Sequence, residues 1–416
     1  MEREVVIVGA GPAGCAAAIF LRQRGRDVLL LDAAEFPRDK ICGESVSPGA
    51  WPLLTDLGVA KAVEALAPWE LRGMAITAPS GIRFAGDYRD APHGGIGVRR
   101  LRFDAMLLDA ARAAGVEVRH PWRVAAVRRD EGGFTLTSAT GDVMRARRVV
   151  LATGGRSLPK TGSDGGGYAL ATALGHTLTS RIFPGLVPLV VADGHFVRGL
   201  RGISVPAALE VRSASGRRRA EAVGSLLCTH FGLSGPAALD VSRHLIDARF
   251  EDPASALVVR WLPEHTAETL DRALREVGGT VGGFLQSRLP ERLARALCAE
   301  AGVEPATPAH RLSRGGRRAL ARAVAEMTVP VTGDRGYAFA EVTAGGVPLR
   351  ELHLDTLGSR VCPGLSLCGE ICDVDGRIGG FNFQWAWASG YVAGTGAFAG
   401  DRASAHPGHG GRRRHA

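Results

Sequence analysis

The chain has 416 residues, of which 45% are hydrophobic and 22% are charged, and its formal net charge is +9. This length accommodates two domains, or one large nucleotide-binding domain with an insertion. The seven cysteines show no CxxC pair and no metal-ligand spacing, so we expect neither a metal site nor a disulfide scaffold. No apolar run approaches the roughly 18 residues of a membrane-spanning helix. Charged residues 2–4 lead directly into an apolar strand, so we expect no signal peptide and a cytoplasmic location.

The positive charge raises the question of nucleic-acid binding. Three arginines, at 412–414, lie in a Gly/His-rich tail from Asp401, and we expect this tail, residues 401–416, to be disordered. The remaining positive charge is spread along the chain. We therefore do not expect nucleic acid as a partner, although an RNA-associated protein stays open as an alternative.

The N-terminal elements predict a nucleotide-binding start. An apolar strand over 4–8, a helix of small residues over 12–24 and a buried strand over 28–31 form a βαβ unit. A helix is expected over 48–66 and an antiparallel excursion over 71–98. An amphipathic helix and four strands are expected to follow, over 101–114, 116–119, 122–128, 133–137 and 145–151.

The pattern changes from about residue 186 to residue 332. A short helix near 168–174 precedes this stretch, which begins with strand-like pieces and continues with helices near 266–276, 283–300 and 315–326. Short buried strands then return, and residues 382–397 are expected to form a closing helix. We therefore expect a discontinuous nucleotide-binding domain, 1–188 with 333–400, and an inserted domain over 189–332.

Gly9, Gly11 and Gly14 form a GxGxxG motif between the first strand and the first helix. The glycines allow a tight turn, close approach of the backbone to a pyrophosphate, and close packing of helix on strand. The helix N-terminus places free N–H groups toward the phosphates. Asp32 ends the second strand 18 residues after Gly14, where its carboxylate can accept hydrogen bonds from the ribose hydroxyls. The motif predicts an adenine dinucleotide without separating FAD from NAD.

Five segments, in order, resemble one bacterial flavoprotein family that includes aminoacetone oxidases and a bile-acid 3-dehydro reductase. They are VVLATGGRSLPKTGSDGGGYALATALGHTLT, PGLVPL, THFGLSGPAAL, AEVTAGGV and GLSLCGEICDVDGRIGGFNFQWAWASGYVAG. The resemblance implies FAD, with Gly369 and Glu370 at the ribityl chain and pyrophosphate. It also implies that residues 379–382 pass under the isoalloxazine ring, where the following helix N-terminus would face the pyrimidine carbonyl.

The N-terminal hundred residues depart from that family. Its GxK…GxGRCN pattern is missing, and FPRDKICGESVSP and VRRLRFDAMLLDAA stand instead. These segments resemble geranylgeranyl reductases and the p-hydroxybenzoate hydroxylase group, in which the arginine of the RxxFDxxL helix helps to hold the flavin. The resemblance implies that Arg100, Arg38 and the Cys-Gly-Glu segment at 42–44 lie near the flavin.

The expected site residues follow from the motif and from the two resemblances. For cofactor binding we expect Gly9, Gly11, Pro12, Ala13, Gly14, Asp32, Arg38, Cys42, Gly43, Arg100, Val124, Ala152, Thr153, Gly154, Gly369, Glu370, Gly379, Gly380, Phe381 and Asn382. For catalysis the candidates are His230, Cys42 and Glu44, because each can carry a proton. The competing interpretations are a structural histidine and an inert core cysteine. No second nucleotide fingerprint is evident, so NAD(P)H would act as a transient electron donor.

We therefore expect an α/β protein with a Rossmann-type FAD-binding domain, like glutathione reductase and p-hydroxybenzoate hydroxylase, and an inserted mixed β-plus-helix substrate domain. The leading function is an FAD-dependent oxidoreductase that transfers a hydride between flavin and a small, largely apolar organic molecule. Conjugated C=C reduction and C–N or C–C oxidation are both open, with secondary metabolism as the setting. The alternatives are a monooxygenase that uses NAD(P)H and dioxygen, and an RNA-associated flavoprotein.

Overall fold

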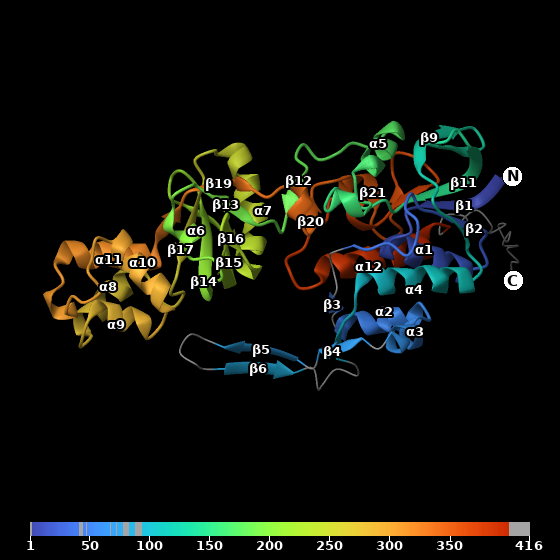
Figure 1. Cartoon of the computed structure of the whole chain (residues 1–416). Coiled ribbons are helices and arrows are strands. Elements are labelled where there is room, and N and C mark those ends of the chain that lie inside the picture. Colours follow the sequence, from blue (N-terminus) through green and yellow to red (C-terminus); the bar gives the residue numbers. More distant parts are fainter. Residues whose placement is uncertain are drawn as a thin grey trace, which may run out of the picture.

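The computed structural model describes residues 2–40, 45–46, 48–66, 68–71, 73–77, 83–87 and 94–398. Figure 1 shows an elongated molecule, in which segments from both ends of the described chain share one part and residues from its middle form the other. A nine-stranded sheet organises the first part, and a seven-stranded sheet organises the inserted part, residues 189–334. The two sheets bury separate hydrophobic cores.

The centre of the nine-stranded sheet is a run of parallel strands. In sheet order these are β23 (Leu365–Leu367), β11 (Val143–Leu151), β1 (Glu2–Val8), β2 (Val28–Leu31) and β8 (Glu117–Arg119). Where these strands pair in parallel, the apolar residues at 5–8, 28–31 and 149–151 are almost fully buried, as expected for parallel strands covered on both faces. Antiparallel strands complete the sheet, namely β9 (Val124–Asp130), β10 (Gly133–Ser138), β21 (Leu352–His353) and β22 (Gly358–Ser359). The predicted α/β class with a Rossmann-type sheet is confirmed.

Three helices pack together beside this sheet, as Figure 1 shows: α1 (Pro12–Gln23), α4 (Arg100–Ala113) and α12 (Phe381–Gly396). Small residues let α1 and α12 approach closely. A Cβ atom at Gly390 would lie 2.3 Å from the carbonyl oxygen of Ala13. The chain's first and last described helices are thus locked together, which fixes the N-terminus of α12 relative to the glycine motif.

The seven-stranded sheet is antiparallel throughout. Its order is β18 (Met327–Val329), β17 (Ala256–Arg260), β14 (Ser204–Arg212), β15 (Arg218–Cys228), β16 (Gly232–Ser234), β13 (Leu189–Val191) and β19 (Val331–Asp334). Helix α7 (Pro236–Glu251) packs on this sheet, and the short α6 (Phe196–Gly199) lies near β16. The expected boundary at 332 falls inside β19. A ribbon of β12 (Phe183–Gly185) and β20 (Val342–Ala344) carries the chain into and out of the inserted part.

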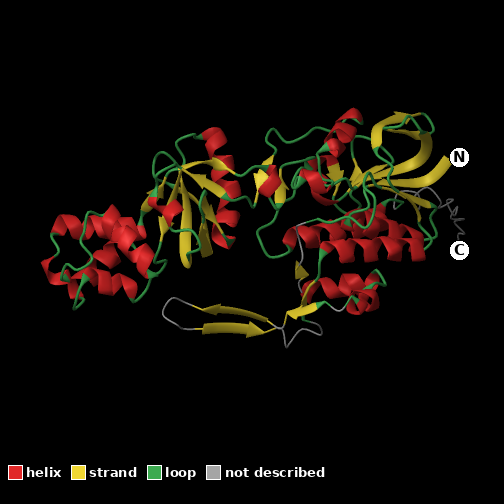
Figure 2. Cartoon of the chain, viewed as in Figure 1, coloured by secondary structure: helices red, strands yellow, loops and turns green. Residues whose placement is uncertain are grey.

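The inserted part ends in a cluster of four helices, here called the helical lobe. It contains α8 (Ala267–Glu276), α9 (Val281–Gln286), α10 (Glu291–Glu300) and α11 (Arg314–Ala325). Figures 1 and 2 show that this lobe lies at the end of the molecule farthest from the nine-stranded sheet. The single helix expected over 283–300 is wrong, because Pro290 cannot continue a helix and α10 begins only after it.

Two further expectations differ from the structure. Residues 48–66 are helical as expected, but they form a 3₁₀ turn, α2 (Trp51–Asp56) and α3 (Ala60–Ala65) instead of one continuous helix, with Gly58 at a positive φ of 74° between the helices. Helix α7 was not expected at all. The antiparallel excursion is present as five short strands, β3 (Ser45–Val46), β4 (Trp69–Leu71), β5 (Gly73–Thr77), β6 (Arg83–Asp87) and β7 (Gly95–Gly97).

No helix in the described part of the chain has the length and apolar character needed to cross a membrane. Within the same residues, no group of three His, Cys, Asp or Glu side chains is arranged to hold a metal ion.

Candidate functional site

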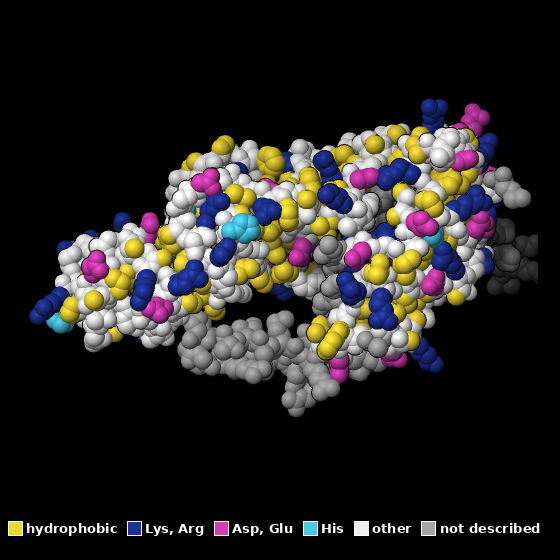
Figure 3. Space-filling view, in the orientation of Figure 1, with side chains coloured by type: hydrophobic (Ala, Val, Ile, Leu, Met, Phe, Trp, Pro, Cys, Tyr) yellow, Lys and Arg dark blue, Asp and Glu magenta, His cyan; other side chains and the backbone are white. Residues whose placement is uncertain are grey.

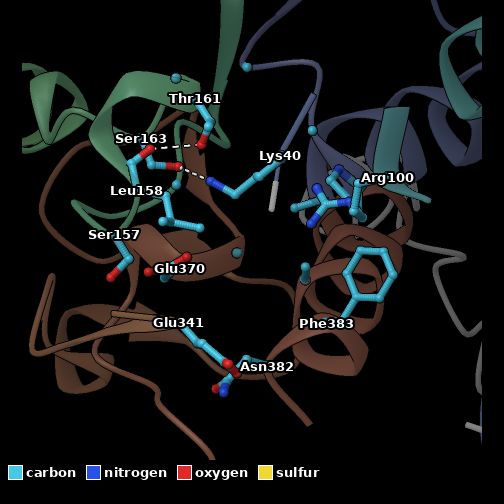
Figure 4. Close-up of a pocket in the computed structure, with 18 of the residues that line it drawn as sticks. Lys40, Arg100, Ser157, Leu158, Thr161, Ser163, Glu341, Glu370, Asn382 and Phe383 are labelled. Carbon is cyan, nitrogen blue, oxygen red and sulfur yellow. Dashed lines mark hydrogen bonds between the residues drawn. The ribbon is translucent and has the colours of Figure 1, made fainter. Parts of the chain in front are cut away.

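A pocket opens at the carboxyl ends of the parallel strands, where ligands bind in open α/β sheets. It encloses about 1130 Å³, including its opening to solvent. Loops that follow β1, β2, β11 and β23 line it, together with the start of α12 and part of the β12–β20 junction. Figure 4 shows side chains from these separate segments converging on one space.

The sequence-predicted cofactor residues converge here to a large extent. Those that line the pocket are Gly9, Gly11, Pro12, Ala13, Asp32, Arg38, Arg100, Ala152, Thr153, Gly154, Gly369, Glu370, Gly379, Gly380 and Asn382. They come from segments up to 373 residues apart in the chain, from Gly9 to Asn382. The fold thus brings the N-terminal and C-terminal motifs to one site.

The GxGxxG turn is packed so closely that side chains are excluded. Gly9 has a φ of +106°, and a Cβ atom there would lie 2.3 Å from the carbonyl oxygen of Ala152. A Cβ atom at Gly14 would lie 1.8 Å from the carbonyl oxygen of Gly9. Gly14 itself does not line the pocket, because it serves the helix–strand packing behind the turn. The first turn of α1 therefore presents backbone to the pocket, as a phosphate site requires.

Asp32 is held by two backbone amides. Its Oδ2 accepts a hydrogen bond from the N–H of Ala10 at 2.7 Å, and its Oδ1 accepts one from the N–H of Ala34 at 2.8 Å. A carboxylate has about four lone-pair positions, so acceptor capacity remains on the side that faces the pocket. This geometry suits recognition of ribose hydroxyls.

Two arginines share one buried carboxylate on the opposite wall. Arg100 donates to Asp104 from Nε at 2.6 Å and from Nη2 at 2.8 Å, while Arg38 Nη1 lies 3.2 Å from Asp104 Oδ2. Asp104 is 1% exposed and Arg100 is 4% exposed. Two guanidinium groups thus lie at the pocket wall, and such groups suit an anionic ligand. The Arg and Asp of the RxxFDxxL motif are therefore bonded to each other.

The loop before α12 is shaped by glycines and held from the inserted part. Gly379 and Gly380 have positive φ values of 120° and 85°. The Asn382 side chain accepts from the N–H of Gly376 at 2.6 Å and donates to its carbonyl oxygen at 3.1 Å. A flat surface of backbone thus lies at the N-terminus of a 16-residue helix, whose positive end faces the pocket.

Comparison with known proteins decides the family. The HI0933-like protein Rossmann domain matches residues 103–396, and an FAD binding domain matches residues 2–161. The first of these matches spans well over half of the chain. The chain belongs to the HI0933-like family. It is an FAD-dependent oxidoreductase.

Individual relatives of this HI0933-like flavoprotein differ in how much of the chain they match. A 3-dehydro-bile acid delta(4,6)-reductase of Clostridium scindens is 36% identical over 282 residues, which cover 66% of this chain and 68% of the relative. A ribosomal RNA dihydrouridine synthase of Escherichia coli is 31% identical over 415 residues, which cover 94% of this chain and 97% of the relative. A menaquinone reductase of Mycobacterium tuberculosis is 35% identical over only 162 residues, 37% of this chain and 38% of the relative. The predicted resemblance to a bacterial flavoprotein family with reductase-like N-terminal motifs is confirmed.

The pocket of this HI0933-like flavoprotein fits FAD. A Cβ atom at Gly11 would meet only Arg38 Nη2, at 3.7 Å, which shows that the backbone there faces open space. A pyrophosphate near this backbone and the arginine pair would leave the glycine loop before α12 for the flavin ring.

The end of the pocket near the inserted part carries residues that sequence reasoning missed. Leu186, Glu341, Arg377 and Ile378 line it. Figure 4 shows Glu341 pointing toward Asn382, on the other side of the pocket from Lys40 and Ser163. Lys40 Nζ donates to Ser163 Oγ at 2.7 Å. The AEVTAGGV segment that contains Glu341 was used only as a family signature, although a carboxylate in a shared motif was a usable signal.

Several predicted residues do not line the pocket. His230 is exposed at the turn between β15 and β16, where its carbonyl oxygen accepts from Arg198 Nε at 2.9 Å. Val124 lies at the start of β9, and Phe381 is 48% exposed at the start of α12. The three candidates Cys42, Gly43 and Glu44 lie outside the described residues. Of the expected catalytic residues, only His230 is described, and it does not line the pocket.

Proposed function

We propose that this flavoprotein reduces a C=C bond conjugated with a carbonyl group in an organic substrate. The observation that carries the proposal is that a carboxyl group, Glu341, and a cationic side chain, Arg377, both line the pocket that Gly379 also lines. An enone requires a carbonyl-polarising group and a proton source in addition to a hydride. In the proposed binding mode, both side chains would lie beside the flavin ring.

Two relatives are matched over two thirds or more of their own length, and the names of both support the same chemistry. One is a delta(4,6)-reductase and the other is a dihydrouridine synthase, so each name describes the addition of two hydrogens. They differ in the molecule that is reduced. The reaction type is therefore better supported than any particular substrate.

Different residues of the chain would hold different parts of FAD. Backbone of the GxGxxG turn and the Arg38–Asp104–Arg100 cluster would hold the pyrophosphate, and Asp32 the adenosine ribose. Bound FAD supplies two-electron hydride transfer. The start of α12 would stabilise negative charge on the adjacent ring by roughly 0.3 to 2 kcal/mol.

The substrate end favours a small, largely apolar molecule with one polar group. Leu186 and Ile378 supply apolar surface there, and Arg377 supplies a guanidinium group that makes no ion pair within the described residues. An apolar pocket with few polar groups orients a ligand through those groups. We further propose a nicotinamide cofactor as the electron donor, which would visit the flavin transiently.

Anaerobic half-reactions test this proposal. The flavin is first reduced with NADH or NADPH, and reoxidation is then followed after addition of 2-cyclohexenone, a 4-ene-3-ketosteroid or dioxygen. Reoxidation by an enone, with two hydrogens added to it, is the expected result. Reoxidation by dioxygen with labelled oxygen entering an organic product would establish a monooxygenase instead and overturn the reductase.

A uracil ring in RNA is a second candidate substrate, and one surface feature favours it. Helix α11 carries Arg314, Arg318 and Arg322 at four-residue intervals, so they share one face and lie about 6 Å apart along the axis. All three are exposed, and none forms an ion pair with any described residue. Figure 3 shows basic side chains on this helical lobe. A row of unpaired arginines suits contact with a phosphate backbone.

A further inference from the structure

Few groups in the described pocket wall can deliver a proton to a substrate. The carboxyl groups that line it are Asp32, Glu341 and Glu370. Asp32 is held by the amides of Ala10 and Ala34 at the dinucleotide end. Glu370 Oε1 accepts a hydrogen bond from the backbone N–H of Thr343 at 2.8 Å. Asp32 therefore belongs to the dinucleotide end of the pocket, and Glu370 is bonded to the backbone of β20.

Glu341 occupies a different place. It directly precedes β20, where the chain returns from the inserted part, and its backbone N–H donates to the carbonyl oxygen of Leu186 at 3.3 Å. Leu186 belongs to the outgoing segment, so Glu341 lies where the two crossings of the chain meet. It lines the pocket and keeps accessible surface there, although protein atoms surround much of the carboxyl group. A substrate in the pocket would thus reach its carboxyl group.

The surroundings favour the protonated form. Burial by the protein atoms around it raises the pKa of Glu341 above its ordinary value, and the nearby carboxylate of Asp240 raises it further. Asp240 is in turn fixed by the N–H of Ile378, 2.7 Å from its Oδ1. A raised pKa brings a carboxyl group closer to the range in which it can act as a general acid.

We propose that Glu341 is the catalytic residue that protonates the substrate carbon next to the carbonyl group; this inference rests on the proposed C=C reduction. The π bond breaks, and the hydride with its electron pair bonds to the far carbon at the expense of the reduced cofactor, which is thereby oxidised. The O–H bond of Glu341 breaks as its proton bonds to the near carbon. Solvent then returns a proton to the carboxylate, so two hydrogens and two electrons are added in total.

The first test compares Glu341→Gln and Glu341→Asp with the matched control Glu264→Gln, an exposed glutamate in the turn between β17 and α8, outside the pocket. Each holoenzyme is reduced anaerobically and mixed with 2-cyclohexenone, a 4-ene-3-ketosteroid or ferricyanide. We expect Glu341→Gln to slow reoxidation by the enones about 100-fold, and Glu341→Asp to slow it less. Ferricyanide reoxidation, which needs no proton delivery to carbon, should remain unchanged. Equal FAD content in all variants shows that folding is intact.

The second test does not depend on turnover. Infrared difference spectra on photoreduction of the flavin should contain a carboxylic C=O band that shifts in D₂O and is lost in Glu341→Gln. Persistence of this band in Glu341→Gln, or an unchanged enone rate, overturns the assignment of Glu341. Wild-type protein whose flavin neither enone reoxidises overturns the proposed function instead, and the infrared band still reports whether Glu341 holds a proton.

Discussion

The Oδ1 atom of Asp240 accepts a hydrogen bond from the backbone N–H of Ile378 at 2.7 Å. One turn further along α7, Arg243 forms a two-point ion pair with Asp375, with Nε 2.6 Å from Oδ2 and Nη2 2.9 Å from Oδ1. A helix of the inserted part therefore holds both ends of the 375–378 loop. This loop leads into Gly379 and Gly380, which line the pocket, so the inserted part helps to shape the pocket wall.

Replacing Asp240 with Ala should weaken FAD binding. The Ile378 amide would lose a charged acceptor, a loss of about 1.5 kcal/mol, which corresponds to roughly a tenfold higher Kd for FAD. Fluorescence titration of apoprotein with FAD measures this change. The matched control is Asp247→Ala on the same helix, whose exposed carboxylate pairs only with Arg181. An unchanged Kd in Asp240→Ala would show that the loop keeps its shape without α7.

Replacing Asp104 with Ala should destabilise the fold and release FAD. The change leaves Arg100 and Arg38 as buried cations without their shared counter-ion, which costs about 3 kcal/mol. Urea unfolding of apoprotein gives the stability difference, and the ratio of visible to ultraviolet absorbance gives the FAD content. Asp109→Ala on the same helix is the control, because that carboxylate is 71% exposed in its pair with Arg112. A stable Asp104→Ala protein with full FAD content would contradict this account.

The dinucleotide end of the pocket was predictable because its chemistry is local. Gly9, Gly11 and Asp32 lie within 24 residues, and strand periodicity alone places them at one edge of a sheet. The Arg100 motif was found by resemblance, but its bond to Asp104 follows simply from an i,i+4 spacing on a helix.

The substrate end was not predictable from pattern. Helix α7 was missed, although Pro236 after Gly235 and an apolar period of three to four residues mark a helix start. Without α7, neither Asp240 nor its contact with Ile378, 138 residues away, could be inferred. The position of Glu341 likewise depends on a tertiary contact, because the segment that leaves the inserted part there packs against Leu186 of the segment that enters it. His230 was favoured because its residue type suits proton transfer, yet residue type gives no information about direction or distance.

The stability of the helical lobe should depend on pH through Asp271. Burial alone would raise the pKa of Asp271, but hydrogen bonds from Arg275 and Arg317 outweigh burial and hold the pKa below its ordinary value. The pairing therefore stabilises the fold above the unfolded-state pKa of about 3.9, and this contribution is lost as pH falls below that value. Asp271→Asn should lower stability by about 1 kcal/mol at pH 7.

Thermal unfolding of the wild type and Asp271→Asn at pH 7 and pH 3 measures this contribution. The difference between their Tm values should shrink at the lower pH, because the Asp271 carboxyl group of the unfolded wild type takes up a proton there and the advantage of the charged, paired form falls. Asp56→Asn serves as the control, because that exposed carboxylate forms no ion pair with any described residue. A Tm difference that is the same at both pH values would exclude a charge contribution at Asp271.

The arginine row on α11 gives a direct test of the RNA candidate. The triple variant Arg314→Gln, Arg318→Gln and Arg322→Gln removes up to three phosphate contacts. Its binding to a ribosomal RNA fragment containing a helix and a loop should weaken. The slope of log K against log salt concentration should become shallower by about 2 to 3, because each lost contact removes about 0.7 to 0.9. Enone reduction should be unchanged, since α11 lies far from the pocket (Figure 1).

A control with the same change in net charge separates a binding surface from general attraction. It replaces three exposed arginines that already pair with carboxylates, namely Arg112, Arg145 and Arg295. If the α11 row is the contact surface, the control should keep most of the RNA affinity and the steep salt dependence of the wild type. If both triple variants lose affinity equally, or if the wild type does not bind the fragment at physiological salt, the +9 charge acts only through its overall field. The free enone would then remain as the substrate class.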